Sequence, residues 1–174
     1  MPILLLAAMA SRARAQAGSR EYELKAVFLF NFAQFVEWPP EAFAQEGAPL
    51  VVGVLGPDPF GAFLDNTVRG EIIAGHPLEV RRFRNAGEIA KCHVLFICRE
   101  EAPRLEAILQ QLAGRCILTV GDGDRFARRG VMIRFFQENN KLRFKVNLEA
   151  ARRAGLTLSS KLLRPAVIVS REDE

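Results

Sequence analysis

The chain has 174 residues, of which 49% are hydrophobic and 25% are charged. This length suits one domain with its own core, and the hydrophobic content excludes a disordered chain. The 24 basic and 20 acidic side chains give a net charge of +4, but the basic residues are not clustered as phosphate binding requires, so the composition does not indicate a nucleic-acid-binding protein.

The first residues have the features of a secretory signal peptide. Residues 3–10 form an apolar run that is too short to span a bilayer, and Ala15-Gln16-Ala17 supplies the small residues that a signal peptidase requires. We therefore expect residues 1–17 to be a cleaved signal peptide and residues 18–174 to be the exported domain. That domain carries 22 basic and 20 acidic side chains and is close to neutral. The alternative is a mildly apolar N-terminal tail.

The first helix of the exported domain is predicted over Glu21–Trp38, where apolar residues cover most of the circumference. At about 100° per residue, Glu23, Gln34 and Glu37 gather in one narrow polar stripe, and Phe30 falls inside it. A phenylalanine on the wet face of a helix indicates a contact with a partner or with a second copy. The alternatives are an isolated surface aromatic and a helix covered by the tail.

Residues 50–136 alternate short apolar runs with helical segments, which is the pattern of a mainly parallel sheet covered on both faces. The predicted strands are Leu50–Leu55, Leu78–Phe83, His93–Cys98 and Cys116–Val120. The predicted helices between them begin at Asp58-Pro59, lie near Glu88 and extend over Pro103–Ala113.

A hairpin and a short helix follow these strands. Val131–Phe136 and Leu142–Val146 are predicted strands joined at Asn139-Asn140, because asparagine tolerates the positive φ of a tight turn. Asn147 is the predicted cap of a helix that ends at Gly155. The whole pattern predicts an α/β fold, a single layered domain with a mainly parallel sheet of about six strands, a C-terminal hairpin and about five flanking helices.

Open α/β sheets place ligands at the carboxyl ends of their strands. The candidate pocket residues at that edge are Asp58, Phe60, Gly121 and Asp122. Because Gly121-Asp122-Gly123-Asp124 brings negative charge to this edge, we expect a cationic, zwitterionic or neutral ligand rather than a pyrophosphate. Helix capping is the alternative role of Asp58 and Asp124.

The three cysteines, Cys92, Cys98 and Cys116, permit at most one intramolecular disulfide. Cys92 and Cys116 begin strands that we expect to be neighbours, so Cys92–Cys116 is the favoured pair. Three small buried thiols without a bridge are the alternative.

No residue pattern predicts catalysis, a metal site or a cofactor. Cys98 and Arg104 have the spacing of a cysteine-phosphatase loop, but the residues between them include two acids, one proline and no glycine. Such a loop opposes both phosphate binding and a low thiol pKa. His76 and His93 have no neighbours that resemble a catalytic triad. We therefore expect a protein that is not an enzyme.

Six segments, in the same order, resemble the YfiR family of bacterial periplasmic proteins. They are Lys25–Pro39, Cys92–Ile97, Leu118–Asp122, Met132–Phe135, Leu142–Leu148 and Ser159–Leu163. The resemblance covers nearly all of residues 21–169. It implies a non-enzymatic, often homodimeric α/β domain in the periplasm that holds an inner-membrane diguanylate cyclase inactive and so lowers cyclic di-GMP.

The resemblance also implies a protein partner. The predicted contacts with the periplasmic domain of such a cyclase are Phe30, Ser159, Ser160, Lys161 and Leu163. We expect the affinity to come from burial of a few apolar anchors rather than from charge. The alternative function is a periplasmic small-molecule-binding domain that resembles one lobe of a solute-binding protein. Some relatives pair the cysteine at the position of Cys92 with one in the first strand, where this chain has Gly53.

Overall fold

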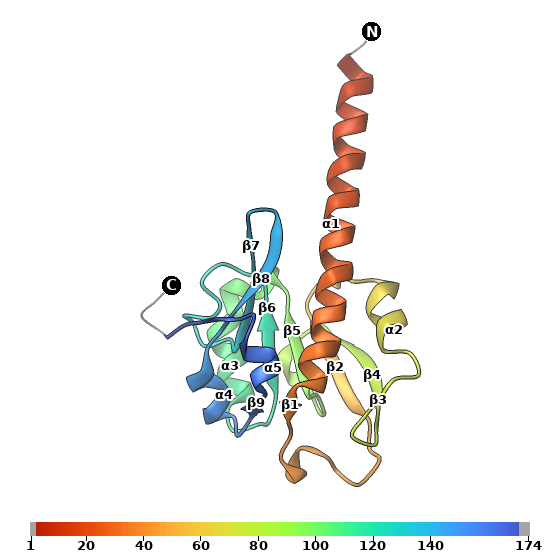
Figure 1. The fold of residues 1–174 in the computed structure, drawn as a ribbon. Coiled ribbons are helices and arrows are strands. Elements are labelled where there is room, and N and C mark those ends of the chain that lie inside the picture. Colours follow the sequence, from red (N-terminus) through yellow and green to blue (C-terminus); the bar gives the residue numbers. More distant parts are fainter. Residues whose placement is uncertain (1–2, 171–174) are drawn as a thin grey trace.

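The computed structural model describes residues 3–170, with side chains from residue 18 onward. Its centre is a sheet with the strand order β10-β8-β7-β6-β5-β2-β4-β3 (Figure 1). Neighbouring strands from β4 to β7 are parallel, whereas β3 and β8 run antiparallel to β4 and β7. The strands are β2 (Leu50–Leu55), β3 (Ile72–Ile73), β4 (His76–Phe83), β5 (Val94–Ile97), β6 (Leu118–Gly121), β7 (Ile133–Glu138), β8 (Lys141–Val146) and β10 (Val167–Ile168).

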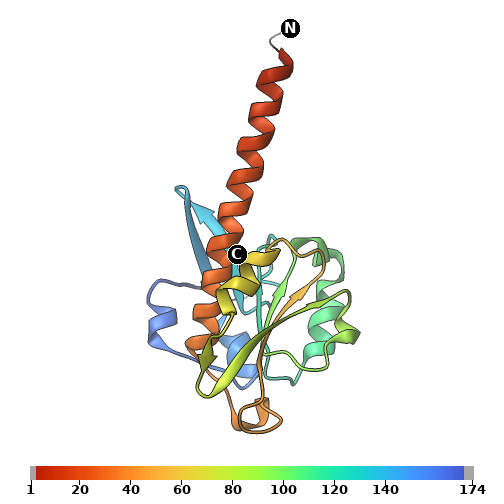
Figure 2. The same ribbon diagram turned by 90° about the vertical axis from the view of Figure 1, so that its right-hand side faces the viewer.

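Helices cover both faces of this sheet (Figures 1 and 2). Side chains of α1, α2, α4 and α5 share one apolar core, and α3 packs in a second core on the other face. The α-helices of the described residues are α1 (Ile3–Gln34), α2 (Ala62–Val68), α3 (Leu105–Leu112), α4 (Leu148–Arg153) and α5 (Ser160–Leu163). Short 3-10 helices are η1 (Pro40–Ala42), η2 (Ala86–Glu88) and η3 (Arg99–Arg104). The predicted mainly parallel α/β fold is confirmed.

The two cores explain why β2 and β5 have no polar side chain at any position. In β5, Val94 and Phe96 belong to the larger core under α1, whereas Leu95 and Ile97 face α3. Aromatic rings dominate the larger core, where Phe32 of α1 stacks on Phe135 with ring centroids 5.7 Å apart. A strand that is buried on both faces has no polar alternation, as the sequence indicated.

Helix α1 projects beyond the body of the domain at its N-terminal end (Figures 1 and 2). The backbone of the predicted cleavage site, residues 15–17, lies inside this helix. Residues 1–2 of the predicted signal peptide lie outside the described residues, as do the side chains of residues 3–17. Across the part of the chain that the structure describes, we find no helix with the length and apolar character needed to cross a bilayer.

The prediction that the first helix continues to Trp38 is wrong. Helix α1 ends at Gln34, and β1 (Val36–Glu37) then pairs antiparallel with β9 (Thr157–Leu158). Pro39 and Pro40 follow, and a proline disfavours helical geometry in the residue before it. The chain therefore leaves the helix early and adds a two-stranded ladder outside the main sheet.

The main sheet has eight strands rather than about six. The additional strands, β3 and β10, have two residues each and lie at the two edges. The predicted hairpin is present, because Asn139 and Asn140 adopt φ angles of 51° and 59° between β7 and β8. Asn147 caps α4, since its side chain accepts a hydrogen bond from the Ala150 amide at 2.9 Å.

Candidate functional site

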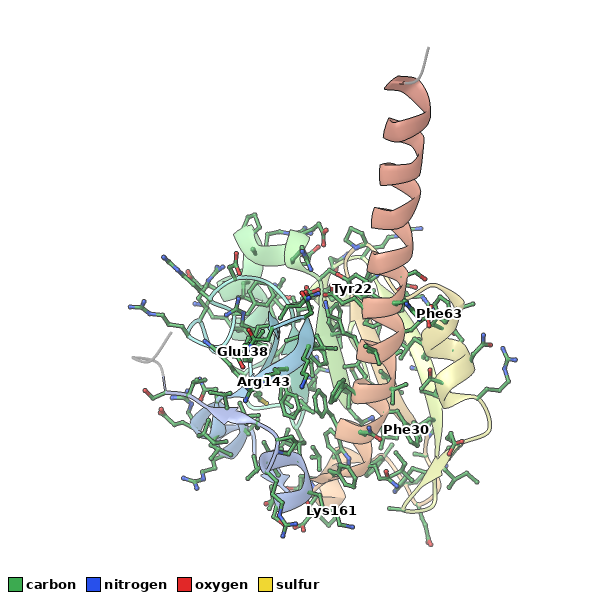
Figure 3. The ribbon with its side chains drawn as sticks, turned by 45° about the horizontal axis from the view of Figure 1, so that its top comes forward. Tyr22, Phe30, Phe63, Glu138, Arg143 and Lys161 are labelled. Carbon is green, nitrogen blue, oxygen red and sulfur yellow. The ribbon has the colours of Figure 1, made fainter. Side chains whose placement is uncertain are left out.

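A buried charge cluster joins α1 to the carboxyl edge of the sheet. Asp122 directly follows β6, and its Oδ2 accepts hydrogen bonds from Tyr22 Oη at 2.7 Å, Lys25 Nζ at 2.6 Å and Arg99 Nη2 at 2.8 Å. Tyr22 and Lys25 lie three residues apart on α1 and so share one face, whereas Arg99 begins η3 after β5. Figure 3 shows Tyr22 at this junction. Three segments that are far apart in the sequence therefore meet at one carboxylate oxygen.

Most of this cluster is shielded from water. The side chains of Lys25 and Asp122 are 1% and 3% exposed, and Glu21 supplies Lys25 with a second carboxylate at 2.5 Å. Burial alone would raise the pKa of Asp122, but the hydrogen bond from Arg99 and the charge of Lys25 outweigh it and hold that pKa below its ordinary value. Burial and the hydrogen bond to Asp122 raise the pKa of Tyr22, so the phenol remains a donor. Asp122 is thus an ionised carboxylate held by three donors.

Asp122 also lines a cavity of about 340 Å³ at this edge of the sheet. Its Oδ1 atom is buried and has no hydrogen-bond partner within the described residues. The other charged or amide side chains that line the cavity are Glu21, Lys25, Arg99, Asp124, Arg134 and Gln137. Positive and negative groups are balanced there, which suits a ligand with little net charge.

The predicted pocket residues divide between two places. Phe60 lies beneath the cluster, edge-on to the Tyr22 ring with centroids 5.4 Å apart, and Gly121 precedes Asp122 with no room for a side chain, because a Cβ would lie 2.6 Å from Phe126. Asp58 is separate from the cavity. It accepts a hydrogen bond from the Phe60 amide at 2.8 Å and pairs with Arg82 at 2.9 Å, so it stabilises its own turn.

Sequence reasoning did not select Tyr22, Lys25 or Arg99. The available signal was Lys25 itself, a charged residue in a helix that is apolar over most of its circumference. An ammonium group inside an apolar face requires a buried anion as its partner. Asp122, directly after a buried strand, was the natural choice.

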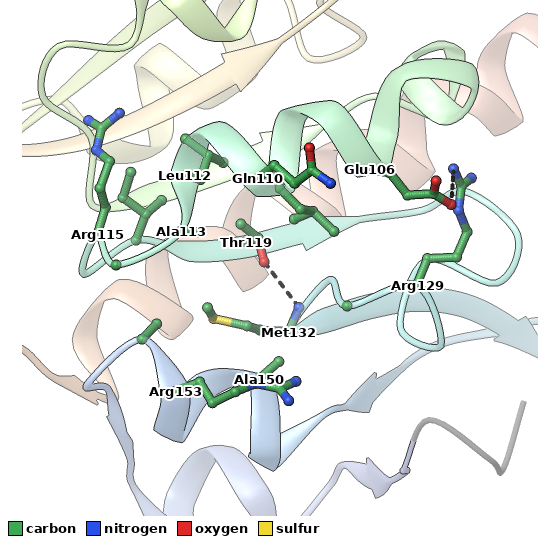
Figure 4. A pocket seen from close by; sticks show the side chains of 15 residues that line it. Glu106, Gln110, Leu112, Ala113, Arg115, Thr119, Arg129, Met132, Ala150 and Arg153 are labelled. Atoms are coloured by element: carbon green, nitrogen blue, oxygen red, sulfur yellow. Dashed lines mark hydrogen bonds and ion pairs between the residues drawn. The ribbon is translucent and has the colours of Figure 1, made fainter.

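A larger cavity, of about 520 Å³, lies between α3 and α4 (Figure 4). Apolar side chains including Leu109, Leu112 and Met132 line its interior, and the Met132 amide donates to Thr119 Oγ1 at 3.1 Å. Its basic lining residues are Arg115, Arg129 and Arg153. None of the site residues predicted from the sequence lines this cavity.

The predicted partner contact Phe30 is half-buried and packs against the larger core. The exposed apolar side chains of α1 are instead Leu24 and Val27, at 53% and 48% exposure, and α2 adds Phe63 at 43%. Phe30 and Phe63 are labelled in Figure 3. The Phe30 ring therefore lies at the margin of the exposed face of α1, partly buried against the larger core.

The C-terminal contact segment lies against the end of α1. The Ser159 amide donates to Phe35 O at 2.9 Å, and Lys161 Nζ lies 5.8 Å from the centre of the Phe35 ring. Ser159 caps α5, Ser160 and Lys161 are exposed, and Leu163 is half-buried. These residues are consecutive with α5 and form a partly exposed patch, and Lys161 lies at the opposite end of the domain from Tyr22 (Figure 3).

A model of the YfiR/HmsC-like protein family matches residues 22–167. The chain belongs to the YfiR/HmsC-like family. The match confirms the resemblance inferred from the six segments, and it spans both the Asp122 cluster and the Ser159–Leu163 patch. A search of curated proteins finds no match to the chain.

The predicted Cys92–Cys116 disulfide is absent from the structure, in which all three cysteines are free. Cys92 packs in the core beside α3, whereas Cys116 lies against the larger core on the other face, so the two side chains diverge. Cys92 Sγ instead donates to Val94 O at 3.2 Å, and burial raises the pKa of Cys92 to about 12. A Cβ on Gly53 would lie 2.7 Å from Cys92 Sγ, so positions 53 and 92 are direct neighbours.

Two histidines hold the loop between β1 and β2. The Phe43 ring stacks between His76 and His93, with centroids 3.6 Å and 4.5 Å away. His93 Nδ1 accepts a hydrogen bond from the Val51 amide at 3.0 Å, so its proton is on Nε2, which donates to Ala42 O at 3.0 Å. Burial lowers the pKa of His93. The neutral ring is therefore a structural connector, and the described residues contain no cluster suited to a metal ion.

Proposed function

We propose that this protein is a periplasmic, non-catalytic regulator that binds an inner-membrane diguanylate cyclase and represses it, lowering cyclic di-GMP. The observation that carries the proposal is membership of the YfiR/HmsC-like family over residues 22–167. The predicted signal peptide, residues 1–17, supports export to the side of the membrane on which such a cyclase exposes its sensory domain.

The chemistry of the buried groups supports a binding role. A phosphatase-like nucleophile needs a low thiol pKa, yet burial first, and the nearby acids Glu100, Asp122, Asp58 and Glu101, raise the pKa of Cys98. Its Sγ donates to Pro57 O at 3.0 Å and is therefore engaged in the fold. Repression by contact requires none of this reactivity.

The contact surface that we propose is the patch formed by Ser159, Ser160, Lys161 and Leu163, together with Phe30. Exposure of Lys161 and Ser160 at the end of α1 supports their access to a partner. Leu163 and Phe30 are half-buried, so each offers an apolar edge while remaining anchored in the fold.

The decisive experiment is deletion of the gene, followed by measurement of cyclic di-GMP and complementation. We expect the deletion to raise cyclic di-GMP and the wild-type protein to restore the lower level. Lys161→Glu combined with Leu163→Glu should fail to restore it and should lose binding to the purified periplasmic domain of the cyclase. Arg69→Glu, an exposed change at the end of α2, is the matched control and should complement fully. An unchanged cyclic di-GMP level after deletion would count against the proposal.

The proposal includes a homodimer. The exposed apolar side chains of Leu24, Val27 and Phe63 support a self-contact along α1 and α2, because soluble proteins seldom leave such neighbours exposed without a role. Light scattering should give twice the monomer mass for the wild type and the monomer mass for Val27→Glu. A monomeric wild type would remove this part of the proposal.

A second candidate function is binding of a small ligand at Asp122. The specific observation in its favour is the buried Oδ1 atom without a partner beside a cavity of about 340 Å³. A screen of small amines, zwitterions and polyols by thermal shift tests it. A stabilising compound should lose its effect in Asp122→Asn, whereas a compound that stabilises both proteins equally binds elsewhere.

A further inference from the structure

The free edge of β8 carries backbone groups that the fold leaves unpaired. The Asn147 amide donates to Met132 O at 2.8 Å, and this bond fixes which residues of β8 point their backbone toward β7. In an antiparallel ladder these residues alternate, so Lys141, Arg143 and Lys145 bond β7, whereas Leu142, Phe144 and Val146 point outward. The two-residue turn at Asn139-Asn140 gives the same phase, since it closes on the Glu138–Lys141 pair.

Strand β10 covers only the last part of this edge. It pairs with Lys145 and Val146, and the Val169 amide donates to Val146 O at 3.0 Å. No other segment of residues 3–170 bonds the Leu142 amide, the Leu142 carbonyl or the Phe144 amide. These three groups lie on a hairpin that projects from the body of the domain (Figure 1).

A groove of about 450 Å³ runs beside these unpaired groups. Its apolar walls are Phe28 from α1, Leu142 and Phe144 from β8, and Pro165. The Phe144 ring is fixed in place by the Phe28 ring, with centroids 5.6 Å apart. An open strand edge next to an apolar groove is the arrangement by which domains bind an added strand, because the backbone supplies affinity and alternate side chains enter the groove.

The opposite face of β8 is basic. Lys141, Arg143 and Lys145 lie there, and Glu138 pairs with Arg143, so the face retains a positive balance. Figure 3 shows Glu138 and Arg143 on the hairpin. A strand added to this edge places alternate side chains beside these charges, where acidic residues are favoured.

We propose that the edge of β8 binds a short extended segment of another protein, with apolar side chains in the groove beside Phe28 and acidic side chains beside Lys141 and Arg143. This surface is separate from the Ser159–Leu163 patch. The proposal does not depend on the partner being a cyclase.

Two other occupants are disfavoured by the structure. An antiparallel pairing with β8 of a second copy would set the basic residues 141, 143 and 145 opposite one another, and like charges opposite each other destabilise a ladder. Residues 167–170 of the same chain do not occupy this edge, because β10 is parallel to β8 and continues past Val146, away from Leu142.

The test uses fluorescein-labelled peptides of about six residues, the usual strand length, that alternate glutamate with valine or lysine with valine. In anisotropy titrations of the full protein we expect the glutamate peptide to bind with a Kd of about 1 mM or tighter, and at least about tenfold tighter than the lysine peptide. Leu142→Ala keeps the outward amide and should weaken binding only a few-fold. Leu142→Pro removes that amide but breaks no bond to β7. Its affinity for the glutamate peptide should therefore be about tenfold weaker than that of Leu142→Ala, while the two variants unfold at the same temperature.

Hydrogen exchange by NMR provides an independent readout. Without peptide, the amides of Leu142 and Phe144 should exchange faster than that of Arg143, and the glutamate peptide should slow the first two only. Lys141→Glu should reduce the preference for the glutamate peptide. No binding of that peptide at about 1 mM, equal binding of both peptides, or equal affinities of the alanine and proline variants would overturn the proposal. Protection of Leu142 that rises with protein concentration alone would assign the edge to a second copy and overturn it as well.

Discussion

Replacing Lys25 with methionine should lower the free energy of unfolding by about 3 kcal/mol, whereas Arg99→Met should lower it by about 1 kcal/mol or less. Both side chains donate to the same oxygen of Asp122, at 2.6 Å and 2.8 Å. They differ in exposure, because the Lys25 side chain is 1% exposed and the Arg99 side chain 52%. The same uncharged replacement at both positions lets the comparison test the role of burial.

The larger magnitude follows from the charge that remains. Removing one partner of a buried ion pair costs about 3–5 kcal/mol, since the other charge is left uncompensated. Asp122 retains Tyr22 and Arg99 as donors, and Glu21, at 24% exposure, can turn toward water, so the lower end of that range applies. Around Arg99, solvent screens the interaction and leaves about 0–1 kcal/mol.

Urea unfolding followed by far-ultraviolet circular dichroism measures both losses, with the slope of the transition as a check that the unfolded states are comparable. Lys25→Met combined with Asp122→Asn should lose less than the sum of the two single changes, because the double variant leaves neither charge buried alone. Equal losses for Lys25→Met and Arg99→Met would refute the conclusion that burial decides the strength of this cluster.

Three further outcomes follow from the described contacts. Gly53→Cys should form a disulfide with Cys92 under oxidising conditions and so lower the number of titratable thiols. In the chain-entropy model this bond adds up to about 4 kcal/mol to the free energy of unfolding. An unchanged thiol count would contradict the close approach of positions 53 and 92. Burial lowers the pKa of His93, so the folded state binds fewer protons than the unfolded state. The contribution of His93 to the free energy of unfolding should therefore be complete above the ordinary pKa of 6.5 and decrease below it. His93→Gln should flatten this pH dependence, and an equal slope in both proteins would exclude His93 as its source. The pKa of Asp122 is also lowered in the folded state, so its contribution to stability is present above pH 3.8 and is lost as the pH falls through the lower folded pKa. Asp122→Asn should remove that part of the acid unfolding transition. Identical acid unfolding profiles of the two proteins would refute this assignment.

The fold was largely predictable because its inner strands carry strong local signals. Leu50–Leu55 was predicted with the bounds that the structure has, since the run is apolar throughout and Gly56-Pro57 ends it. The hairpin was predictable from its turn. Asn139-Asn140 permits the positive φ angles and fixes which residues of the two strands lie opposite each other. Two-residue strands such as Ile72–Ile73 and Val167–Ile168 have no period to detect, so only tertiary pairing reveals them.

The candidate site was predictable only in part. Asp122 was found from its place after a buried strand, but its donors Tyr22 and Lys25 lie about a hundred residues earlier, and no local pattern links them. Phe30 was placed in a polar stripe by assuming a helical rotation of about 100° per residue as far as Glu37. That residue lies in β1 rather than in the helix. With α1 ending at Gln34, the predicted polar stripe loses its last member, and the exposed large apolar side chains of the helix are Leu24 and Val27.

Helix α1, together with Phe35 directly after it, contributes to the Asp122 cavity, the β8 groove and the C-terminal patch. Lys25 anchors it at the Asp122 cavity, Phe28 forms a wall of the β8 groove, and the Phe35 carbonyl holds the Ser159 amide at the C-terminal patch. Lys25 and Phe28 lie within one turn of α1, and Phe35 directly follows the last residue of the helix. We therefore expect Lys25 to matter beyond stability, because its bond to Asp122 fixes the helix against which the proposed β8 groove and C-terminal patch are built.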